Sequence, residues 1–270
     1  QQCSANTSAC PHFTGWRCGV EGFSIAYTAP AAGAVAVYID GVADFNFSRI
    51  FINGCDVGFD IDDATIVHGN DFQVTSYITN GVRARDGSLD VHISSFILNA
   101  GNATNGSLGG IRLSNFVDAF MAINGDILNG VYSLTTEATT YDVGQRPGNS
   151  NFTSVFFDSS ANSPAILNDI TNSEFVGCWF SGGRTGAAFP GSQVQQTDSL
   201  TFTNCRFFNC GSHGVASGST SARTTFIGCK ADSNGRVAAS SAGFHFATCS
   251  NWQMIGCRSR NGLFPGGAQT

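Results

Sequence analysis

The sequence predicts an all-β protein that folds as a right-handed parallel β-helix, a solenoid of about ten coils. Three observations lead to this prediction: a cysteine-containing repeat, short alternating segments separated by Asn-Gly turns, and a charged content of only 12%. Long amphipathic helices depend on Lys, Glu and Arg, whereas this chain of 270 residues has a single lysine, Lys230. Helix-rich fold classes are therefore excluded.

The repeat is clearest in the last third of the chain. Four segments combine an apolar residue, two spacers and a cysteine, and their cysteines are Cys178, Cys205, Cys229 and Cys257. Successive cysteines are 27, 24 and 28 residues apart. A period of this length indicates a solenoid, because each repeat is one unit that buries its apolar face only against its neighbours.

Each repeat contains short strands that end in a turn. Asn53-Gly54 and Asn80-Gly81 are 27 residues apart, and Asn234-Gly235 and Asn261-Gly262 are again 27 apart. Such short strands are unstable alone, but stacked coils pair their backbones. We therefore expect three short strands in each coil, with Phe, Ile, Val and Cys pointing inward as ladders. Leucine is too sparse for a leucine-rich repeat, and a propeller blade needs about 40 residues.

We expect two parts, a segment at residues 1–19 and a β-helix at residues 20–270 that is cut short at its C-terminus. The first part holds Cys3, Cys10, His12 and Cys18. Zinc, a local disulfide or free thiols would each account for these residues, and their wide spacing favours the last two. The other histidines lack metal-ligand spacing and no Gly-Lys phosphate loop occurs, so we expect no cofactor.

Composition and charge exclude further classes. The net charge of −6 argues against a nucleic-acid partner, which would require a basic footprint. No apolar run reaches the ~18 residues that a membrane-spanning helix needs, so we expect no membrane insertion. With 42% apolar residues, the chain is also unlike a disordered polar segment.

Outward positions follow from the alternation of side chains along a strand. If Cys178 points inward, Trp179 points outward, and aligning the coils gives the outward row Asn124, Phe156, Trp179, Arg206, Lys230 and Arg258. Aromatic faces stack on sugar rings, and Arg or Lys binds carboxylate or sulfate. The candidate substrate-binding residues are therefore Phe156, Trp179, Arg206 and Lys230. The alternative is that a loop or a neighbouring subunit covers the aromatic rings.

The next outward row, two residues further on, brings two carboxylates onto adjacent coils. In this alignment it contains Asp126, Asp158, Ser181, Phe208, Asp232 and Arg260. Adjacent carboxylates push their pKa values apart, as acid–base catalysis requires, and glycosidases space them ~5 Å for retention or ~6.5–9.5 Å for inversion. Asp126 and Asp158 are therefore the candidate catalytic residues. The alternative is that each Asp caps a turn at a strand end.

Three further acids are reserve candidates. Glu137 and Asp142 lie in the longest irregular insertion, residues 135–150, and a loop beside a groove often contributes to a site. Glu174 precedes the strand of Trp179. A separate acidic cluster contains Asp56, Asp60, Asp62 and Asp63. Calcium binding would suit these carboxylates, but they lack the spacing of a calcium loop, which favours a solvated turn.

Two runs carry a resemblance to a known family: Cys-Arg-Phe-Phe-Asn-Cys-Gly-Ser-His-Gly at residues 205–214, and Phe-Ser-Arg-Ile-Phe-Ile-Asn-Gly-Cys-Asp-Val-Gly-Phe-Asp-Ile at residues 47–61. Their repeat style resembles the pectate-lyase-like β-helices of bacteriophage tailspikes and covers nearly the whole chain. The resemblance implies a homotrimer on the virion tail, with other phage tail proteins as partners. It also implies adsorption to bacterial surface polysaccharide, often with cleavage by paired Asp or Glu, but it assigns no catalytic role to a particular residue.

The same superfamily includes pectate lyases, polygalacturonases and alginate epimerases. Among the polygalacturonase motifs Asn-Thr-Asp, Asp-Asp and Arg-Ile-Lys, only Asp62-Asp63 is present here, which weakens a pectinase interpretation. Three hypotheses follow. The first is a tailspike-like protein that binds and depolymerises surface polysaccharide as a glycoside hydrolase or lyase. The others are a non-catalytic receptor-binding or structural tail protein, and a secreted polysaccharide lyase or hydrolase.

Overall fold

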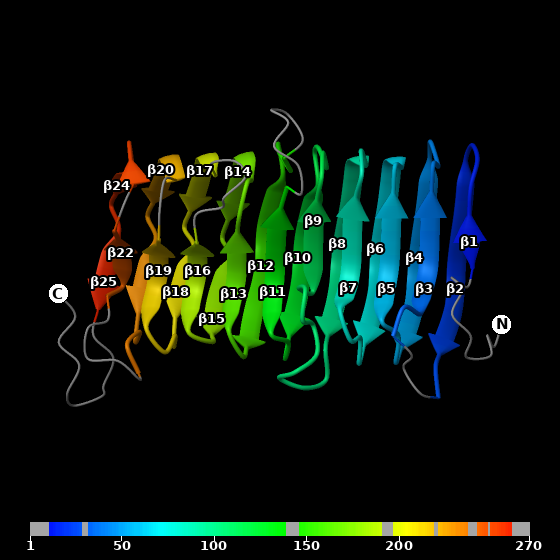
Figure 1. The fold of residues 1–270 in the computed structure, drawn as a ribbon, viewed down its shortest axis with the longest axis horizontal. Coiled ribbons are helices and arrows are strands. Elements are labelled where there is room, and N and C mark those ends of the chain that lie inside the picture. Colours follow the sequence, from blue (N-terminus) through cyan, green and yellow to red (C-terminus); the bar gives the residue numbers. More distant parts are fainter. Residues whose placement is uncertain are drawn as a thin grey trace.

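The computed structural model is a rod of β-strands that lie side by side in chain order (Figure 1). It describes residues 11–28, 32–138, 146–190, 197–218, 221–236, 242–247 and 249–260. Neighbouring strands pair in parallel throughout these residues. None of the described segments forms a helix that is long and apolar enough to span a membrane. The predicted all-β parallel β-helix is confirmed.

The first sheet, called sheet A, has ten strands among the described residues. They are β1 (His12–Phe13), β3 (Val35–Asp40), β5 (Val57–Asp62), β7 (Asn80–Arg85), β9 (Ile111–Ser114), β11 (Tyr132–Glu137), β13 (Ser163–Leu167), β16 (Thr185–Phe189), β19 (His213–Ser217) and β22 (Phe244–Phe246). Each coil contributes one of these strands, which agrees with the prediction of about ten coils.

The second sheet, sheet B, runs along the rest of each coil. Its main path is β2 (Cys18–Ala26), β4 (Phe45–Asn53), β6 (Thr65–Thr75), β8 (Leu89–Asn99), β10 (Met121–Leu128), β12 (Asn151–Ser160), β14 (Thr171–Val176), β17 (Asp198–Thr203), β20 (Ser221–Ile227) and β23 (Cys249–Ser250). The sheet also includes β15 (Trp179–Gly182), β18 (Arg206–Phe208), β21 (Lys230–Asp232), β24 (Gln253–Ile255) and β25 (Arg258–Arg260).

Sheet B bends sharply at one position in every coil. The residues there, which we call the bend column, are Gly22, Arg49, Asp71, Ser95, Asn124, Ser154, Gly177, Asn204, Gly228 and Gly256. Their φ angles lie between 52° and 68°, the left-handed region that Gly, Asn and Asp adopt most readily. The bend divides sheet B into a pre-bend arm and a post-bend arm. With sheet A they make the three short strands predicted for each coil.

Aromatic ladders fill the interior, as the repeat predicted. Phe152, Phe175, Phe202 and Phe226 stack in successive coils with ring centroids 4.8, 4.6 and 4.9 Å apart. A second ladder consists of Phe157, Phe180 and Phe207, with spacings of 4.8 and 4.9 Å. All seven rings are fully buried, so each coil is held mainly by apolar contact with its neighbours.

The repeated cysteines lie between these ladders. Cys178, Cys205 and Cys229 are buried free thiols. Each donates to the carbonyl of a Phe in the preceding coil, and the three Sγ–O distances are 3.1, 3.2 and 3.3 Å. The prediction that they pack inward as small apolar groups is confirmed, and each thiol also supplies a weak hydrogen bond at the bend.

Candidate functional site

The outward side chains of the post-bend arms form a continuous surface, which we call the post-bend face. Its outer row contains Asp126, Phe156, Trp179, Arg206, Lys230 and Arg258, each paired in register with the next. Its second row contains Leu128, Asp158, Ser181, Phe208, Asp232 and Arg260. The predicted alignment is correct from Phe156 to Arg258.

The predicted alignment is wrong by two residues one coil earlier. Asn124 belongs to the bend column, and Asp126 is the strand neighbour of Phe156. The error arises at Gly125, which occupies an interior position without an apolar side chain. A Cβ on Gly125 would lie only 2.1 Å from Cζ of Phe96, so the ring from the preceding coil already fills that space.

Asp126 and Asp158 consequently lie in different rows of adjacent strands. Asp158 occupies the position opposite Leu128, two residues beyond the partner of Asp126. The two carboxylates are diagonal neighbours on one face, not the directly stacked pair that the alignment predicted. They still interact, because burial raises the pKa of Asp126 and the charge of Asp158 raises it further.

Asp158 has local partners that hold its carboxylate. The hydroxyl of Ser181 on the next coil donates to its Oδ1, and the backbone N–H of Ser159 donates to the same oxygen at 2.6 Å. Asp126 therefore retains its proton to higher pH than an isolated Asp, while the carboxylate of Asp158 is held by these two hydrogen bonds.

Exposed aromatic rings adjoin the acids. The rings of Phe156 and Trp179 lie 4.9 Å apart, and these residues are 38% and 41% exposed. No loop of the described residues covers them. Phe208 meets Trp179 edge-on at 5.4 Å, and the guanidinium of Arg206 lies 5.6 Å from the centre of Trp179 and 4.7 Å from that of Phe208. These contacts fix the orientation of the Phe156 and Trp179 rings, which we call the aromatic platform, while leaving their outer surface open.

The reserve acids lie on other faces or outside the described residues. Glu137 ends β11 on sheet A, where it forms an ion pair with Arg112. This pair lines a cleft of about 340 Å³ with Leu108 and Pro190. Glu174 is exposed on the pre-bend arm of β14. Asp142 falls in residues 139–145, outside the described residues.

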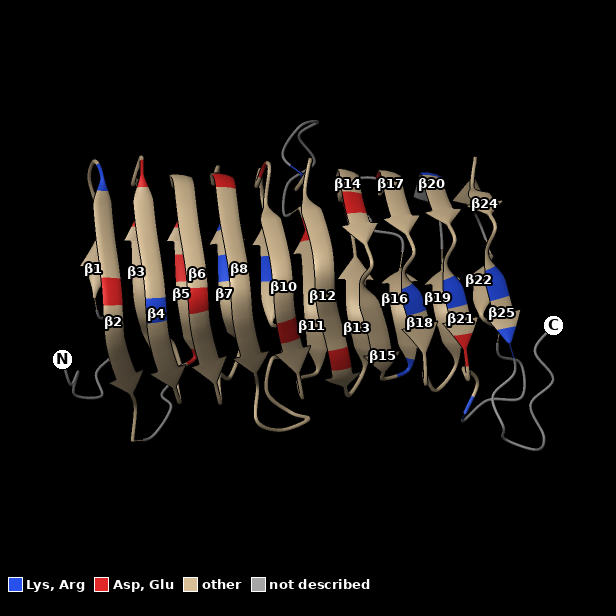
Figure 2. Ribbon diagram, turned by 180° about the vertical axis from the view of Figure 1, so that it is seen from behind, with Lys and Arg blue, Asp and Glu red and all other residues tan. Residues whose placement is uncertain are grey.

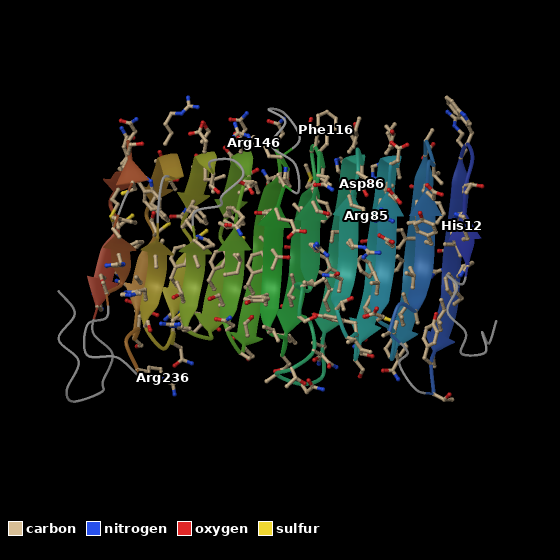
Figure 3. All side chains as sticks on the ribbon, in the orientation of Figure 1. His12, Arg85, Asp86, Phe116, Arg146 and Arg236 are labelled. Atoms are coloured by element: carbon tan, nitrogen blue, oxygen red, sulfur yellow. The ribbon has the colours of Figure 1, made fainter. Side chains whose placement is uncertain are left out.

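Sheet A carries a charged network that sequence reasoning missed. Arg83 holds Asp60 with two hydrogen bonds of 2.8 and 2.5 Å, and Arg85 adds two of 3.1 and 3.4 Å. Arg85 also pairs with Asp86 at 2.6 Å (Figure 3). The interpretation of this acidic cluster as a solvated turn is wrong for Asp60, which is 2% exposed in a strand. The signal was an Asp-x-Asp and an Arg-x-Arg one repeat apart.

The charged groups of this network are paired with one another. Arg85 also contacts Asp62 at 2.6 Å, and the hydroxyl of Tyr38 donates to Asp62 at 2.8 Å. Burial and this bond raise the pKa of Tyr38 to about 12. His12 stacks on Tyr38 with ring centroids 4.7 Å apart, whereas Cys3 and Cys10 lie outside the described residues. Among the residues that are described, no three His, Cys, Asp or Glu side chains are arranged to hold a metal.

Solved structures resemble this chain, although no protein family model and no curated protein matches it. The tailspike protein gp49 of Acinetobacter baumannii bacteriophage Fri1, a capsular polysaccharide depolymerase, aligns with a TM-score of 0.63 and 11% identity over 91% of this chain and 52% of its own. The fold is that of phage tailspikes. The ORF18 protein of Geobacillus virus E2 gives a TM-score of 0.61 and 14% identity over 90% of this chain and 53% of its own.

The tailspike fold is shared with a polysaccharide-modifying enzyme. The periplasmic alginate epimerase AlgG aligns with a TM-score of 0.59 and 10% identity over 87% of this chain and 61% of its own. The predicted parallel β-helix is therefore confirmed as the fold that these structures share. This tailspike-like chain spans about half the length of the two phage proteins, and at such low identities the likeness establishes the fold alone.

Proposed function

We propose that this chain binds bacterial surface polysaccharide on its post-bend face and depolymerises it with Asp126 and Asp158. One observation carries the proposal. Asp126 has a pKa raised by burial and by Asp158, and it is the strand neighbour of the exposed ring of Phe156. A carboxyl whose pKa is raised beside an aromatic surface combines a candidate general acid with a sugar-binding surface.

The diagonal offset of the two acids favours an inverting hydrolase. One strand spacing and two residues along the strand separate their Cα atoms by about 8 Å. Carboxyl groups that keep a similar separation would fall within the ~6.5–9.5 Å of inverting glycosidases and beyond the ~5 Å of retaining enzymes. Asp126 would donate its proton to the glycosidic oxygen as the C–O bond breaks. Asp158 would take a proton from the water that forms the new bond to the anomeric carbon.

The aromatic rings give the platform its binding role. Phe156 and Trp179 would stack on successive sugar rings, because sugar C–H faces and aromatic rings bury apolar surface together. Arg206 and Lys230 would bind groups at the far end of the same strand of glycan. The rings lie directly beside Asp126 along the outer row, so a stacked chain would pass over the acids.

The biological setting belongs to the same proposal. The likeness to the Fri1 tailspike and to a protein of Geobacillus virus E2 supports a protein of the virion tail that acts during host adsorption, as a homotrimer with other tail proteins as partners. A secreted polysaccharide lyase or hydrolase is the alternative, which the likeness to an epimerase supports. Antibody labelling of the purified virion tests the location, and a gene remote from virion structural genes would contradict it.

The activity test uses purified capsular polysaccharides and lipopolysaccharides from a panel of bacterial strains, with glycan size followed by chromatography. We expect shortened chains from one strain or a few, and loss of shortening in both Asp126→Asn and Asp158→Asn. Asp71→Asn is the matched control, because Asp71 is an exposed acid of the bend column, away from the post-bend face. Glycan that is retained but never shortened would instead support a receptor-binding tail protein.

A further inference from the structure

The post-bend face changes charge along its length (Figure 2). Asp126 and Asp158 lie on β10 and β12, whereas β18, β21 and β25 present the basic residues Arg206, Lys230, Arg258 and Arg260. The only carboxylate among these basic residues is Asp232 on β21. The whole chain has a net charge of −6, so this local concentration of cations opposes the overall balance.

These cations are weakly compensated. Arg206 and Arg258 each approach Asp232 only to 3.8 Å, which is too long for a hydrogen bond. Arg206 Nε and Asp232 Oδ1 are buried without a hydrogen-bond partner among the described residues. No ion pair of Lys230 occurs within the described part of the chain. Sheet A differs, since Arg83 and Arg85 there are bonded to Asp60 at 2.5–3.4 Å.

We propose that Arg206, Lys230 and Arg258 bind the carboxylate or sulfate groups of an acidic polysaccharide. The inference rests on the proposed function and names its substrate class. Consecutive cations on this row lie about 4.8 Å apart, so one anionic sugar can contact two of them. Planar guanidinium groups beside an ammonium suit oxyanions of either kind.

The charge gradient also gives the bound glycan a direction. An anionic group over Asp126 and Asp158 would be repelled, so the acidic sugars lie over the basic row and the cleaved bond lies over the acid pair. Three strand spacings, about 14 Å, separate the positions of Asp126 and Arg206. Trp179 and Phe156 occupy the intervening coils and would bind the sugars between the two ends.

The test compares polymers that share one backbone: dextran, carboxymethyl dextran and dextran sulfate. Affinity electrophoresis of the whole protein should give binding to one or both charged polymers and none to dextran, and the two charged polymers distinguish carboxylate from sulfate recognition. The double variant Lys230→Gln/Arg258→Gln should lose about two- to thirtyfold in affinity, because it removes two exposed ion pairs with the polymer. Arg17→Gln/Arg49→Gln is the matched control, because it removes the same charge away from this face.

Three outcomes would overturn the inference: equal binding of dextran, an equal loss in the control variant, or tighter binding of a single-stranded DNA oligonucleotide than of either charged polymer. Aromatic and basic side chains also bind single strands, so the last arm is required. The inference and the proposed activity fail separately. Asp126→Asn should keep its affinity for the charged polymer while losing depolymerisation, so that a failure of binding and a failure of cleavage are distinguished.

Discussion

The coils before Cys178 and the coils from Cys178 onward bend in different ways. In the earlier coils a single strand such as β8 (Leu89–Asn99) runs through the bend without interruption. In the later coils the strand ends at the bend, so that β14 (Thr171–Val176) and β15 (Trp179–Gly182) are separate. The same residue position therefore allows two different local structures within one sheet.

The interior position just after the bend accounts for the difference. Through the ten coils it holds Phe23, Ile50, Phe72, Phe96, Gly125, Val155, Cys178, Cys205, Cys229 and Cys257. The large side chain of Phe96 at this position is accommodated by Gly125, which occupies the same position in the next coil. The small thiols of the later coils instead leave room for a Phe ladder on each side.

Packing of the interior is therefore maintained by compensation between coils and not by one residue type at one position. Where the compensation repeats, as around Cys205, the outer rows are also regular. Trp179, Phe208 and the basic residues of the post-bend face lie on these regular coils, whereas Phe156 shares β12 with Asp158. The acids Asp126 and Asp158 lie where the pattern changes, on the last two coils before Cys178.

The largest expected effect comes from the regular ladder. Phe202 is fully buried between Phe175 and Phe226, so Phe202→Ala should lower the free energy of unfolding by about 3–5 kcal/mol. Phe96→Ala is the matched variant, since its ring stacks on Phe72 at 5.6 Å and faces Gly125 on the other side. We expect the smaller loss there, measured by denaturant unfolding. An equal or larger loss for Phe96→Ala would mean that the ladder adds no stability.

The next effect tests the compensation at Gly125. An added methyl group would lie 2.1 Å from Cζ of Phe96, so Gly125→Ala should cost about 1–3 kcal/mol by overpacking. Combining it with Phe96→Leu should recover part of this loss, and the double-mutant cycle measures the coupling. Gly218→Ala serves as control, because its nearest contact is 3.4 Å. Additive losses of stability in the double variant would mean that Gly125 and Phe96 are not coupled, which would contradict the compensation.

Regularity also decided what could be predicted from sequence. The cysteine spacing and the flanking Phe residues predicted the fold and aligned Phe156 to Arg258 correctly, because each later coil repeats the same inward residues. The alignment failed at Asp126 because Gly125 gives no apolar signal, its space being filled by Phe96 from 29 residues earlier. A compensation between distant residues has no signature in a local pattern.

Charges on sheet A illustrate a second limit. Asp60 and Arg83 are 23 residues apart, close to one repeat, yet their pairing requires the register of β5 and β7. Acidic residues considered without that register suggested calcium or a solvated turn. Asp126 and Asp158 were nominated from the same kind of pattern, and their catalytic role stays a prediction until activity is measured.

Thiol reactivity measures how firmly the later coils are closed. Burial raises the pKa of Cys55 and of Cys210 to about 12, and burial also raises the pKa of Cys205. At pH 8 the native protein should therefore react with iodoacetamide at exposed Cys249 at least about tenfold faster than at these three, which are buried. Peptide mapping by mass spectrometry gives the order, and unfolded protein is the control. Fast labelling of Cys205 would contradict a closed ladder.

The smallest effect separates the two ends of the post-bend face. The folded-state pKa of Asp126 is raised, so the protonated carboxyl stabilises the fold relative to the charged one. This stabilisation is fully present below ~3.9, the unfolded pKa, and is lost as pH rises through the folded pKa. Asp126→Asn should thus stabilise the protein at pH 7 by at most about 1 kcal/mol, and the gain should vanish at low pH. Asp232→Asn should act in the opposite direction, because Asp232 lies 3.8 Å from both Arg206 and Arg258. The measurement is thermal unfolding of both variants at pH 7 and at low pH. If the two variants shift the unfolding temperature in the same direction at pH 7, the charge gradient has no energetic consequence.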